Sequence, residues 1–140
     1  MRYLLDTNIF IYYATDKGLL SEDVYEAISE PDALLCVSIE TVRELIIDYN
    51  NKSFDTRMWK TAKEMVKDIK NKFFIKILPL QEEHMITYAQ LRPYVKEGHK
   101  DPSDHIIISH AITNRMILVS SDQNFPYYVN YGLDLLFNEK

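Results

Sequence analysis

Residues 3–11 have the sequence YLLDTNIFI, in which one carboxylate, Asp6, interrupts an otherwise apolar stretch. Apolar residues precede Asp6, and a second apolar run follows Thr7 and Asn8. This pattern predicts a short buried strand that ends at Asp6 and leads into a helix. A carboxylate in such surroundings is partly buried, and an unpaired buried charge costs several kcal/mol. We therefore expect hydrogen-bond donors or a cation to hold Asp6.

The rest of the chain alternates short apolar runs with longer segments of helical period. Most of the runs lack the alternation of a strand with one solvent-exposed face, so we expect strands that are covered on both faces. Strands that alternate with helices predict a parallel α/β sheet with right-handed crossovers. The predicted strands are Tyr3–Leu5, Leu34–Val37, Phe73–Leu78 and Met116–Val119, with a weaker one at Leu133–Phe137.

Helices are expected between these strands, at residues 9–15, 21–30, 39–50, 55–71, 81–97 and 102–114. Side chains that can accept a hydrogen bond from a helix N-terminus precede four of them. These predicted N-caps are Ser21, Ser38, Asp55 and Asp101. Pro102 then occupies the first position of the last helix, where its missing N–H costs nothing.

Length and composition predict one folded domain over residues 1–140. Of the 140 residues, 46% are hydrophobic, which is enough for a core and argues against disorder. No apolar run approaches the ~20 residues that cross a bilayer, and no signal-peptide core forms before Asp6, so we expect a cytoplasmic protein. Cys36 is the single cysteine, which excludes a disulfide framework, and the histidines form no HExxH zinc-protease motif.

Charge is unevenly distributed along the chain. Residues 52–76 contain eight basic and three acidic side chains, although the whole chain has a net charge of −5. Such a division suits a protein that holds cations in one place and polyanions in another. In the helix predicted at 55–71, one face carries a row of lysines that could contact phosphates, or that could simply be solvated. The row is Lys60, Lys63, Lys67 and Lys70.

Acidic residues stand where the predicted strands end. Asp6 follows the first strand and Asp122 follows the fourth, while Asp101 and Asp104 open the helix that leads to the fourth strand. Glu44 lies on the helix after the second strand. Ligands of parallel sheets bind beyond the carboxyl ends of the strands, so most of these carboxylates should reach one rim. Taken singly, each has a plainer interpretation as an N-cap, a helix-dipole partner, a turn residue or a solvated side chain.

Four segments taken together resemble the motifs of PIN-domain nucleases, and most closely those of VapC-type toxins of bacterial toxin–antitoxin pairs. They are Asp6-Thr7-Asn8, Arg43-Glu44-Leu45, His99-Lys100-Asp101-Pro102-Ser103-Asp104 with the apolar run after it, and Ser120-Ser121-Asp122-Gln123-Asn124-Phe125. The resemblance covers almost the whole chain, in the order and spacing of the family. The chain departs from the common pattern at Ser103, often Phe in relatives, and at His105, often Arg, which puts any phosphate contact or ion pair from position 105 in doubt.

This resemblance implies a three-layer α/β/α fold with a mostly parallel sheet of four to five strands. It also implies a ribonuclease whose carboxylates bind Mg²⁺ or Mn²⁺, ions that prefer oxygen ligands. The residues implied as catalytic and metal-binding are Asp6, Glu44, Asp104 and Asp122, with Asn8, Asp101 and Ser120 in support. An RNA substrate, a cognate antitoxin and a homodimer are the implied partners.

Two other functions remain open from the residues alone. Phosphoaspartyl-transfer enzymes also place an aspartate after the first strand, but they carry a second one two residues later, where this chain has Asn8. A non-catalytic module could use the same fold to bind RNA or protein. All four acidic positions are filled, so the sequence shows no sign of an inactivated site.

Overall fold

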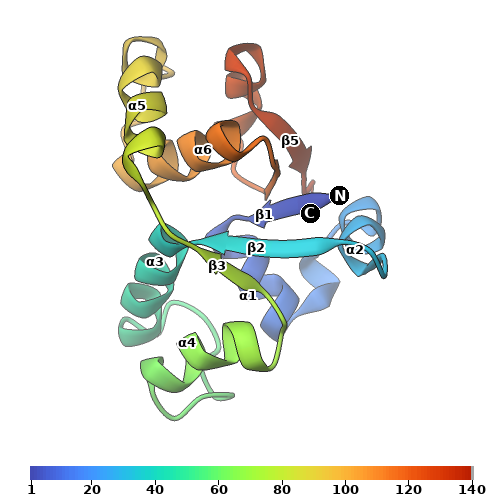
Figure 1. Cartoon of the computed structure of the whole chain (residues 1–140). Helices are drawn as coiled ribbons and strands as arrows, with labels where there is room; N and C mark the ends of the chain where they lie inside the picture. The colour runs from blue at the N-terminus through green and yellow to red at the C-terminus, as the bar shows by residue number, and fades with distance from the viewer. Residues whose placement is uncertain (140) are drawn as a thin grey trace.

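The computed structural model describes residues 1–139, and its strands form a five-stranded sheet (Figure 1). The order in the sheet is β3-β2-β1-β4-β5, and all neighbouring strands are parallel. The expected parallel α/β sheet is therefore confirmed. The strands are β1 (Arg2–Leu5), β2 (Leu34–Ser38), β3 (Lys76–Leu78), β4 (Ile117–Ser120) and β5 (Asp134–Phe137).

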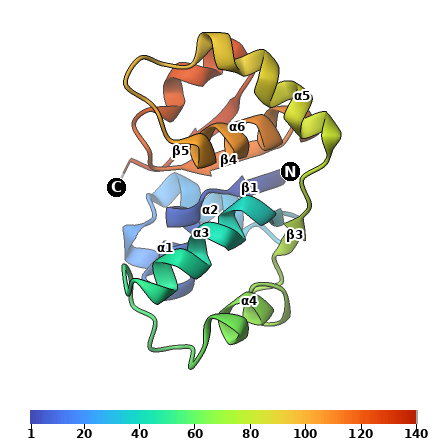
Figure 2. The same ribbon diagram turned by 90° about the vertical axis from the view of Figure 1, so that its left-hand side faces the viewer.

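Helices cover both faces of the sheet and complete the expected three layers. Helices α1 to α4 lie on one face, and α5, α6 and the short 3₁₀ helix η3 lie on the other (Figure 2). No helix in residues 1–139 is long and apolar enough to cross a membrane. The helices are α1 (Thr7–Thr15), α2 (Glu22–Ser29), α3 (Ile39–Asn50), α4 (Ala62–Asn71), α5 (Glu82–Leu91) and α6 (Pro102–Asn114), with 3₁₀ helices η1 (Lys17–Leu19), η2 (Arg92–Tyr94) and η3 (Phe125–Tyr131).

Alternate residues of the central strands belong to two separate hydrophobic cores. In β1, Leu5 packs with α1 to α4, whereas Leu4 packs with α5 and α6, and neither side chain is accessible to solvent. Burying a leucine side chain contributes about 1.5–3 kcal/mol, so both faces stabilise the strand. This arrangement confirms the prediction from the unbroken apolar runs. Cys36 of β2 is buried in the second core as a free thiol.

The strand order creates a crevice next to β1. After β1 the chain builds β2 and β3 on one side and then crosses to build β4 and β5 on the other. Helices connected to the two sides diverge at such a switch point, and the carboxyl ends of the two central strands border the opening. Leu5 pairs with Val119 in the register of β1 and β4. Asp6 and Asp122, which follow these strands, therefore emerge at the same edge.

Side-chain caps explain where several helices begin. Ser38 Oγ accepts a hydrogen bond from Glu40 N at the start of α3, and Asp101 Oδ1 accepts one from Ser103 N at the start of α6. Both predicted N-caps are confirmed, as is Pro102 at the first position of α6. Ser21 also occupies the N-cap position of α2, although its hydroxyl donates to Asp23 Oδ1 rather than capping the helix.

The fourth helix begins seven residues later than the sequence predicts. Asp55 is not its N-cap, because the carboxylate forms an ion pair with Arg57, with 2.8 Å between Oδ2 and Nη2. Thr61 caps α4 instead by accepting a hydrogen bond from Glu64 N. Trp59 precedes the helix and is buried, and its Nε1 donates to Asp68 Oδ2. Lys60 therefore lies outside the helix that was expected to carry it.

The third strand and the fifth helix are both shorter than predicted. The third strand starts at Lys76 because Phe74 adopts a left-handed backbone conformation, with φ of 56°, that a strand cannot accommodate. The fifth helix ends at Leu91, and the 3₁₀ helix η2 follows it. Pro93 in η2 lacks the N–H that a longer α-helix would use.

A buried histidine pair joins α6 to α5 and to the sheet. His110 of α6 is inaccessible to solvent, and its Nδ1 lies 2.8 Å from Ser38 Oγ. The rings of His110 and His84 are 4.2 Å apart between centroids. Burial, with a smaller effect of His84, lowers the pKa of His110 to about 4. His110 is therefore neutral in the folded protein at neutral pH.

We predict that acid destabilises the fold through His110. Below about pH 6.5 the unfolded chain binds a proton at this residue, whereas the folded chain binds it only near pH 4, so stability falls as the pH falls between these values. At pH 5 the effect is about 2 kcal/mol. The His110→Gln variant has no side chain at this position that can bind a proton in this pH range. Urea denaturation should show the wild type losing stability relative to the variant between pH 7.5 and pH 5, and a constant difference would contradict the assignment.

Candidate active site

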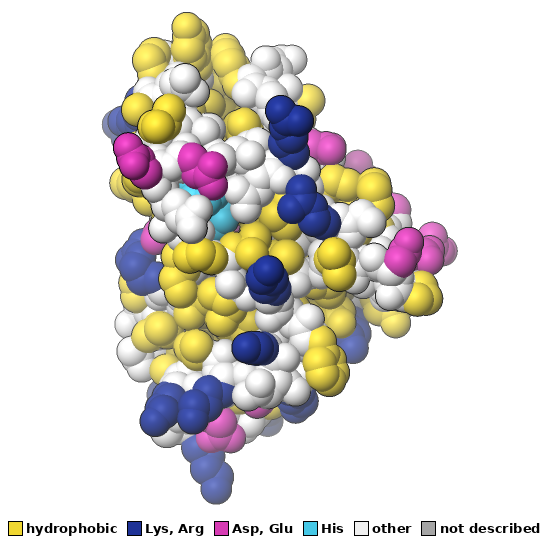
Figure 3. Space-filling model, in the orientation of Figure 1, with side chains coloured by type: hydrophobic (Ala, Val, Ile, Leu, Met, Phe, Trp, Pro, Cys, Tyr) yellow, Lys and Arg dark blue, Asp and Glu magenta, His cyan; other side chains and the backbone are white. Residues whose placement is uncertain are grey.

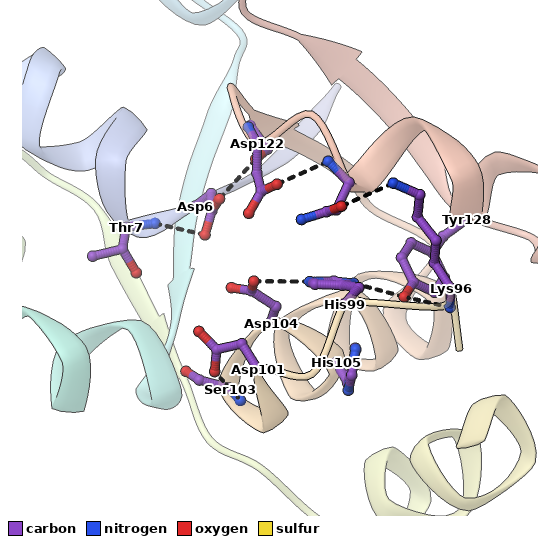
Figure 4. A network of polar contacts seen from close by, with 12 residues as sticks. Asp6, Thr7, Lys96, His99, Asp101, Ser103, Asp104, His105, Asp122 and Tyr128 are labelled. Atoms are coloured by element: carbon purple, nitrogen blue, oxygen red, sulfur yellow. Dashed lines mark hydrogen bonds and ion pairs between the residues drawn. The ribbon is translucent and has the colours of Figure 1, made fainter. Parts of the chain in front are cut away.

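A small pocket at the carboxyl ends of β1 and β4 collects side chains from four parts of the chain. Its volume is about 210 Å³. Figure 4 shows Asp6, Asp101, Asp104 and Asp122 turned toward a common centre. Of the seven residues predicted for the site, six line this pocket and Ser120 lies behind it. The lining residues are Asp6, Thr7, Asn8, Glu44, Asp48, Asp101, Asp104 and Asp122.

Asp6 is held by neutral donors at the end of β1. Its Oδ1 accepts a hydrogen bond from Thr7 N at 2.8 Å, and its Oδ2 accepts one from Ser120 Oγ at 2.7 Å. Burial nevertheless raises the pKa of Asp6 to about 7, and the charges of Asp104 and Glu44 act in the same direction. The two hydrogen bonds oppose this rise without cancelling it. The sequence expectation that donors hold Asp6 is confirmed.

Glu44 reaches the pocket from the second turn of α3. Thr7 Oγ1 donates a hydrogen bond to Glu44 Oε1 at 2.6 Å, which ties α3 to the start of α1. Burial raises the pKa of Glu44. The neighbouring cation, Arg43, pairs with Glu40 at 2.6 Å. The charge of Glu44 is thus left without a cationic partner.

Asp101 and Asp104 enter the pocket from the N-terminus of α6. Asp101 is the N-cap of α6, as the sequence predicts, and its side chain also lines the pocket. Burial raises the pKa of Asp104 to about 8, and Asp101, Asp122 and Glu44 add to the rise. One carboxylate oxygen from each of Glu44, Asp101 and Asp104 lies within 4.8 Å of the others. This spacing suits the ligands of one metal ion.

Ser120 connects the two aspartates that leave the sheet. Its hydroxyl donates to Asp6 Oδ2 and accepts from Asp122 N at 3.0 Å. Asp122 Oδ1 accepts a hydrogen bond from Asn124 N, so Asp122 also forms a turn. A turn residue was one of the plainer interpretations of these acids from the sequence. The turn and the pocket use the same carboxylate. Ser120 therefore sets the positions of Asp6 and Asp122 relative to each other.

Sequence reasoning missed three residues of the site. Thr7 lines the pocket and donates hydrogen bonds to Asp6 and Glu44, and its place between Asp6 and Asn8 was the available signal. Asp48 lines the pocket from α3, one turn after Glu44, and the i, i+4 spacing of the two acids was the available signal. His99 Nε2 lies 2.9 Å from Asp104 Oδ2, and the ring is only 3% exposed. Burial lowers the pKa of His99. His99 stands two residues before Asp101, inside the motif that was singled out for its acids.

The two unusual positions of the motif face away from each other. His105 is buried, and its Nδ1 lies 3.2 Å from Arg92 Nη1 in the second core layer, so its side chain does not line the pocket. A phosphate contact from this position is excluded by its burial. Ser103 Oγ is buried near Glu40 and Glu44. Its hydroxyl adds to the lowering of the Glu40 pKa by Arg43 and opposes the rise that burial causes at Glu44.

The chemistry of the pocket fits a divalent cation. Within residues 1–139, none of its six carboxylates forms an ion pair with Lys or Arg. Hard oxygen ligands of this kind suit Mg²⁺ and similar ions. Burial raises the pKa values of Asp6 and Asp104, and repulsion from the neighbouring carboxylates adds to the rise. A bound cation would relieve that repulsion.

The predicted lysine row lies apart from this pocket. Lys63, Lys67 and Lys70 are exposed on α4, and Lys60 is exposed just before it. Figure 3 shows Lys and Arg side chains around an apolar area over β2 and β3. A groove of about 630 Å³ opens there at the other end of the strands, with Leu34 and Phe74 among its exposed side chains. The structure thus brings the acids together but does not join them to the lysines.

Comparison with known proteins supports the same fold. The family model of the PIN domain matches residues 3–129. No curated protein matches the chain. A structure of VapBC-1 from nontypeable Haemophilus influenzae is similar with a TM-score of 0.72 and 21% identity over 100% of both chains. VapBC2 from Rickettsia felis, bound to a promoter DNA fragment, has a TM-score of 0.72 and 19% identity over 99% of both chains. The structure of FitAcB from Neisseria gonorrhoeae has a TM-score of 0.64 and 21% identity over 97% of this chain and 96% of the FitAcB chain.

We predict that Asp6→Asn stabilises the protein in the presence of a chelator. The change removes a buried charge, and an Asn oxygen can still accept the Thr7 hydrogen bond. Because the pKa of Asp6 is raised in the folded state, ionising it costs stability as the pH rises, so the advantage of the variant should grow from pH 5 to pH 8. A melting temperature several degrees higher at pH 8 is expected.

The control variant is Asp32→Asn, which removes the same charge from an exposed residue instead of a buried one. Asp32→Asn should leave the melting temperature nearly unchanged at both pH values. If Asp6→Asn melts no higher than the wild type at pH 8, ionised Asp6 does not destabilise the folded protein and this description is wrong.

Proposed function

The chain belongs to the PIN-domain family, and on this premise we propose that it is a metal-dependent endoribonuclease that acts as the toxin of a toxin–antitoxin pair. One observation carries the proposal: Asp6, Glu44, Asp104 and Asp122 are far apart in sequence but line one pocket, and no Lys or Arg within residues 1–139 pairs with them. We take residues 1–140 as a single PIN-like domain.

The four carboxylates are the proposed ligands of Mg²⁺ or Mn²⁺. Such an ion supplies a more acidic bound water and neutralises charge on the phosphoryl oxygens. The protein's own contribution is orientation. Thr7 fixes both Asp6, through its backbone N–H, and Glu44, through its hydroxyl. Ser120 fixes Asp6 against Asp122.

The supporting residues have separate parts in this proposal. Asp101 lines the pocket and also starts α6, so it adds negative charge beside Asp104 and stabilises the helix that carries it. Asn8 is exposed at the rim, where its amide is free to contact a substrate or its waters. The site is open on that side, as a polymer substrate requires.

The proposed contact for the RNA backbone is the lysine row, formed by Lys63, Lys67 and Lys70 of α4 and by Lys60 just before it. An acidic pocket repels a polyanion, so attraction has to come from another surface. Exposed lysines contact phosphates without reading sequence, and their contribution falls as the salt concentration rises. Met65 and Ile69 pack α4 onto the core and leave the lysines on its free face.

A cognate antitoxin and a homodimer complete the proposal. The similar structures include complexes described as belonging to toxin–antitoxin systems. The apolar groove with exposed Leu34 and Phe74 is the kind of surface that a partner covers. We place the protein in the cytoplasm, where an RNA substrate is available.

Phosphoaspartyl transfer is less compatible with the geometry. Both oxygens of Asp6 already accept hydrogen bonds, and the side chain is only 7% exposed. A nucleophile in such enzymes needs an accessible oxygen and a partner acid, and Asn8 cannot supply the acid. A binding module without catalysis would not need four mutually repelling carboxylates.

We predict RNA cleavage that depends on these carboxylates. Purified protein should cut RNA in Mg²⁺ or Mn²⁺ and leave 5′-phosphate and 3′-hydroxyl ends, and a chelator should stop the reaction. Asp6→Asn should lower the rate by at least about 100-fold, because it removes a charge that the bound ion needs. Full activity of this variant, or equal cleavage in excess chelator, would contradict the proposal.

We predict that Lys67→Glu weakens RNA binding. The substitution should raise KM several-fold in low salt, leave kcat nearly unchanged, and lose its effect in high salt as the phosphate contacts are screened. Lys17→Glu makes the same change of charge on an exposed residue of η1 and serves as the control. Equal KM values for the two variants would show that α4 does not bind the substrate.

A further inference from the structure

His99 connects the acidic pocket to the core of the protein. It lies in the segment between η2 and α6, and its ring is almost completely buried. One ring nitrogen, Nε2, is 2.9 Å from Asp104 Oδ2, and the other, Nδ1, is 2.6 Å from the Tyr128 hydroxyl (Figure 4). Tyr128 is itself inaccessible to solvent. The three side chains form a continuous line from the core to the pocket.

The hydrogen positions between Tyr128, His99 and Asp104 follow from the hydrogen bonds of Tyr128. The Tyr128 oxygen accepts a hydrogen bond from Lys96 N at 3.1 Å, so its own hydrogen is available for donation. We assign that hydrogen to the close contact with His99 Nδ1, which places the ring hydrogen on Nε2. His99 Nε2 then donates to Asp104 Oδ2. Tyr128 therefore sets His99 as a donor toward the carboxylate.

The ring has little freedom to turn away from Asp104. It packs edge-on against His105, with 4.5 Å between centroids, and it also contacts Phe125 and Tyr128. Asp104, by contrast, stands among Asp101, Asp122 and Glu44, whose charges all repel it. A fixed donor on one oxygen opposes this repulsion and limits rotation of the carboxylate.

The same segment also reaches the second aspartate of the pocket. Lys96 Nζ donates to Asn124 Oδ1, and Asn124 N donates to Asp122 Oδ1. The charge of Lys96 is thus directed to an amide and stays out of the pocket. Residues 96–99 hold Asp104 on one side and the Asp122 turn on the other.

We propose that His99 is a positioning residue that fixes Asp104 for cation binding through the hydrogen bond from Nε2, with Tyr128 fixing His99 in turn. The proposal rests on the proposed function, because it takes the pocket to be a divalent-cation site. Donors to ligating carboxylates typically change metal affinity by 10–100-fold when they are removed. His99 touches neither the ion nor the RNA in this arrangement.

Two amide substitutions that differ by one methylene group test the proposal. The Gln amide reaches the position of the His Nε2, so His99→Gln can still donate to Asp104. The shorter Asn amide reaches only the position of Nδ1, so His99→Asn keeps the contact with Tyr128 and loses the one with Asp104. Mn²⁺ is the probe, and its affinity is measured by the electron paramagnetic resonance signal of the free ion. Melting temperatures of the metal-free proteins confirm that both variants fold.

The expected result is a 10–100-fold weaker Mn²⁺ affinity for His99→Asn and an affinity within about threefold of the wild type for His99→Gln. Tyr128→Phe should give an intermediate loss, because His99 keeps its place but not its fixed hydrogen. Equal affinities for the wild type and His99→Asn, or equal losses in both amide variants, would overturn the proposal. Failure of the wild type to bind Mn²⁺ would overturn it as well.

A spectroscopic measurement separates positioning from direct ligation. Electron spin-echo modulation of bound Mn²⁺ should show no directly coordinated imidazole nitrogen, and a nitrogen signal that disappears in His99→Gln would make His99 a ligand instead. Neither readout uses RNA. A wild-type protein that binds Mn²⁺ but cleaves no RNA would therefore contradict the proposed function and leave the comparison of the His99 variants valid.

Discussion

The repulsion among carboxylates gathered in one pocket is the constraint on which the rest of the site depends. Among the described residues, no lysine or arginine pairs with Asp6, Glu44 or Asp104, and neutral donors hold these side chains instead. Those donors orient the carboxylates but do not offset the cost of burying their charges side by side, as the raised pKa values of Asp6 and Asp104 indicate. Burying these charges costs the free protein stability, and a cation bound among them would offset that cost.

Topology creates this pocket, and packing keeps it rigid. The switch of direction between β1 and β4 opens the sheet edge where Asp6 and Asp122 emerge, and the N-terminus of α6 adds Asp104. Each of these elements is anchored in one of two dense cores, so the carboxylates cannot relax by moving apart. The histidines His99 and His110 belong to this anchoring, since each links α6 to a different neighbour.

The order of the elements and the positions of Asp6 and Asp122 could be predicted from local rules in the sequence, whereas the full set of site carboxylates came from the resemblance to PIN-domain motifs. Unbroken apolar runs predict buried parallel strands, and carboxylates directly after such runs must lie at the sheet edge. The start of α4 could not be predicted, since Asp55 and Thr61 are both good caps and only the Arg57 ion pair distinguishes them. His99 was missed because its partner Tyr128 comes from an element 29 residues later.

The central claim is that side chains from four separate elements form one site for a divalent cation. Anomalous diffraction from crystals grown with Mn²⁺ tests it most directly, because the signal places the ion without assumptions about activity. The account predicts a peak within bonding distance of carboxylate oxygens of Asp6 and Asp104, and its loss in crystals of Asp6→Asn. A pocket without a peak at saturating Mn²⁺, or a peak bound only elsewhere on the protein, would contradict it.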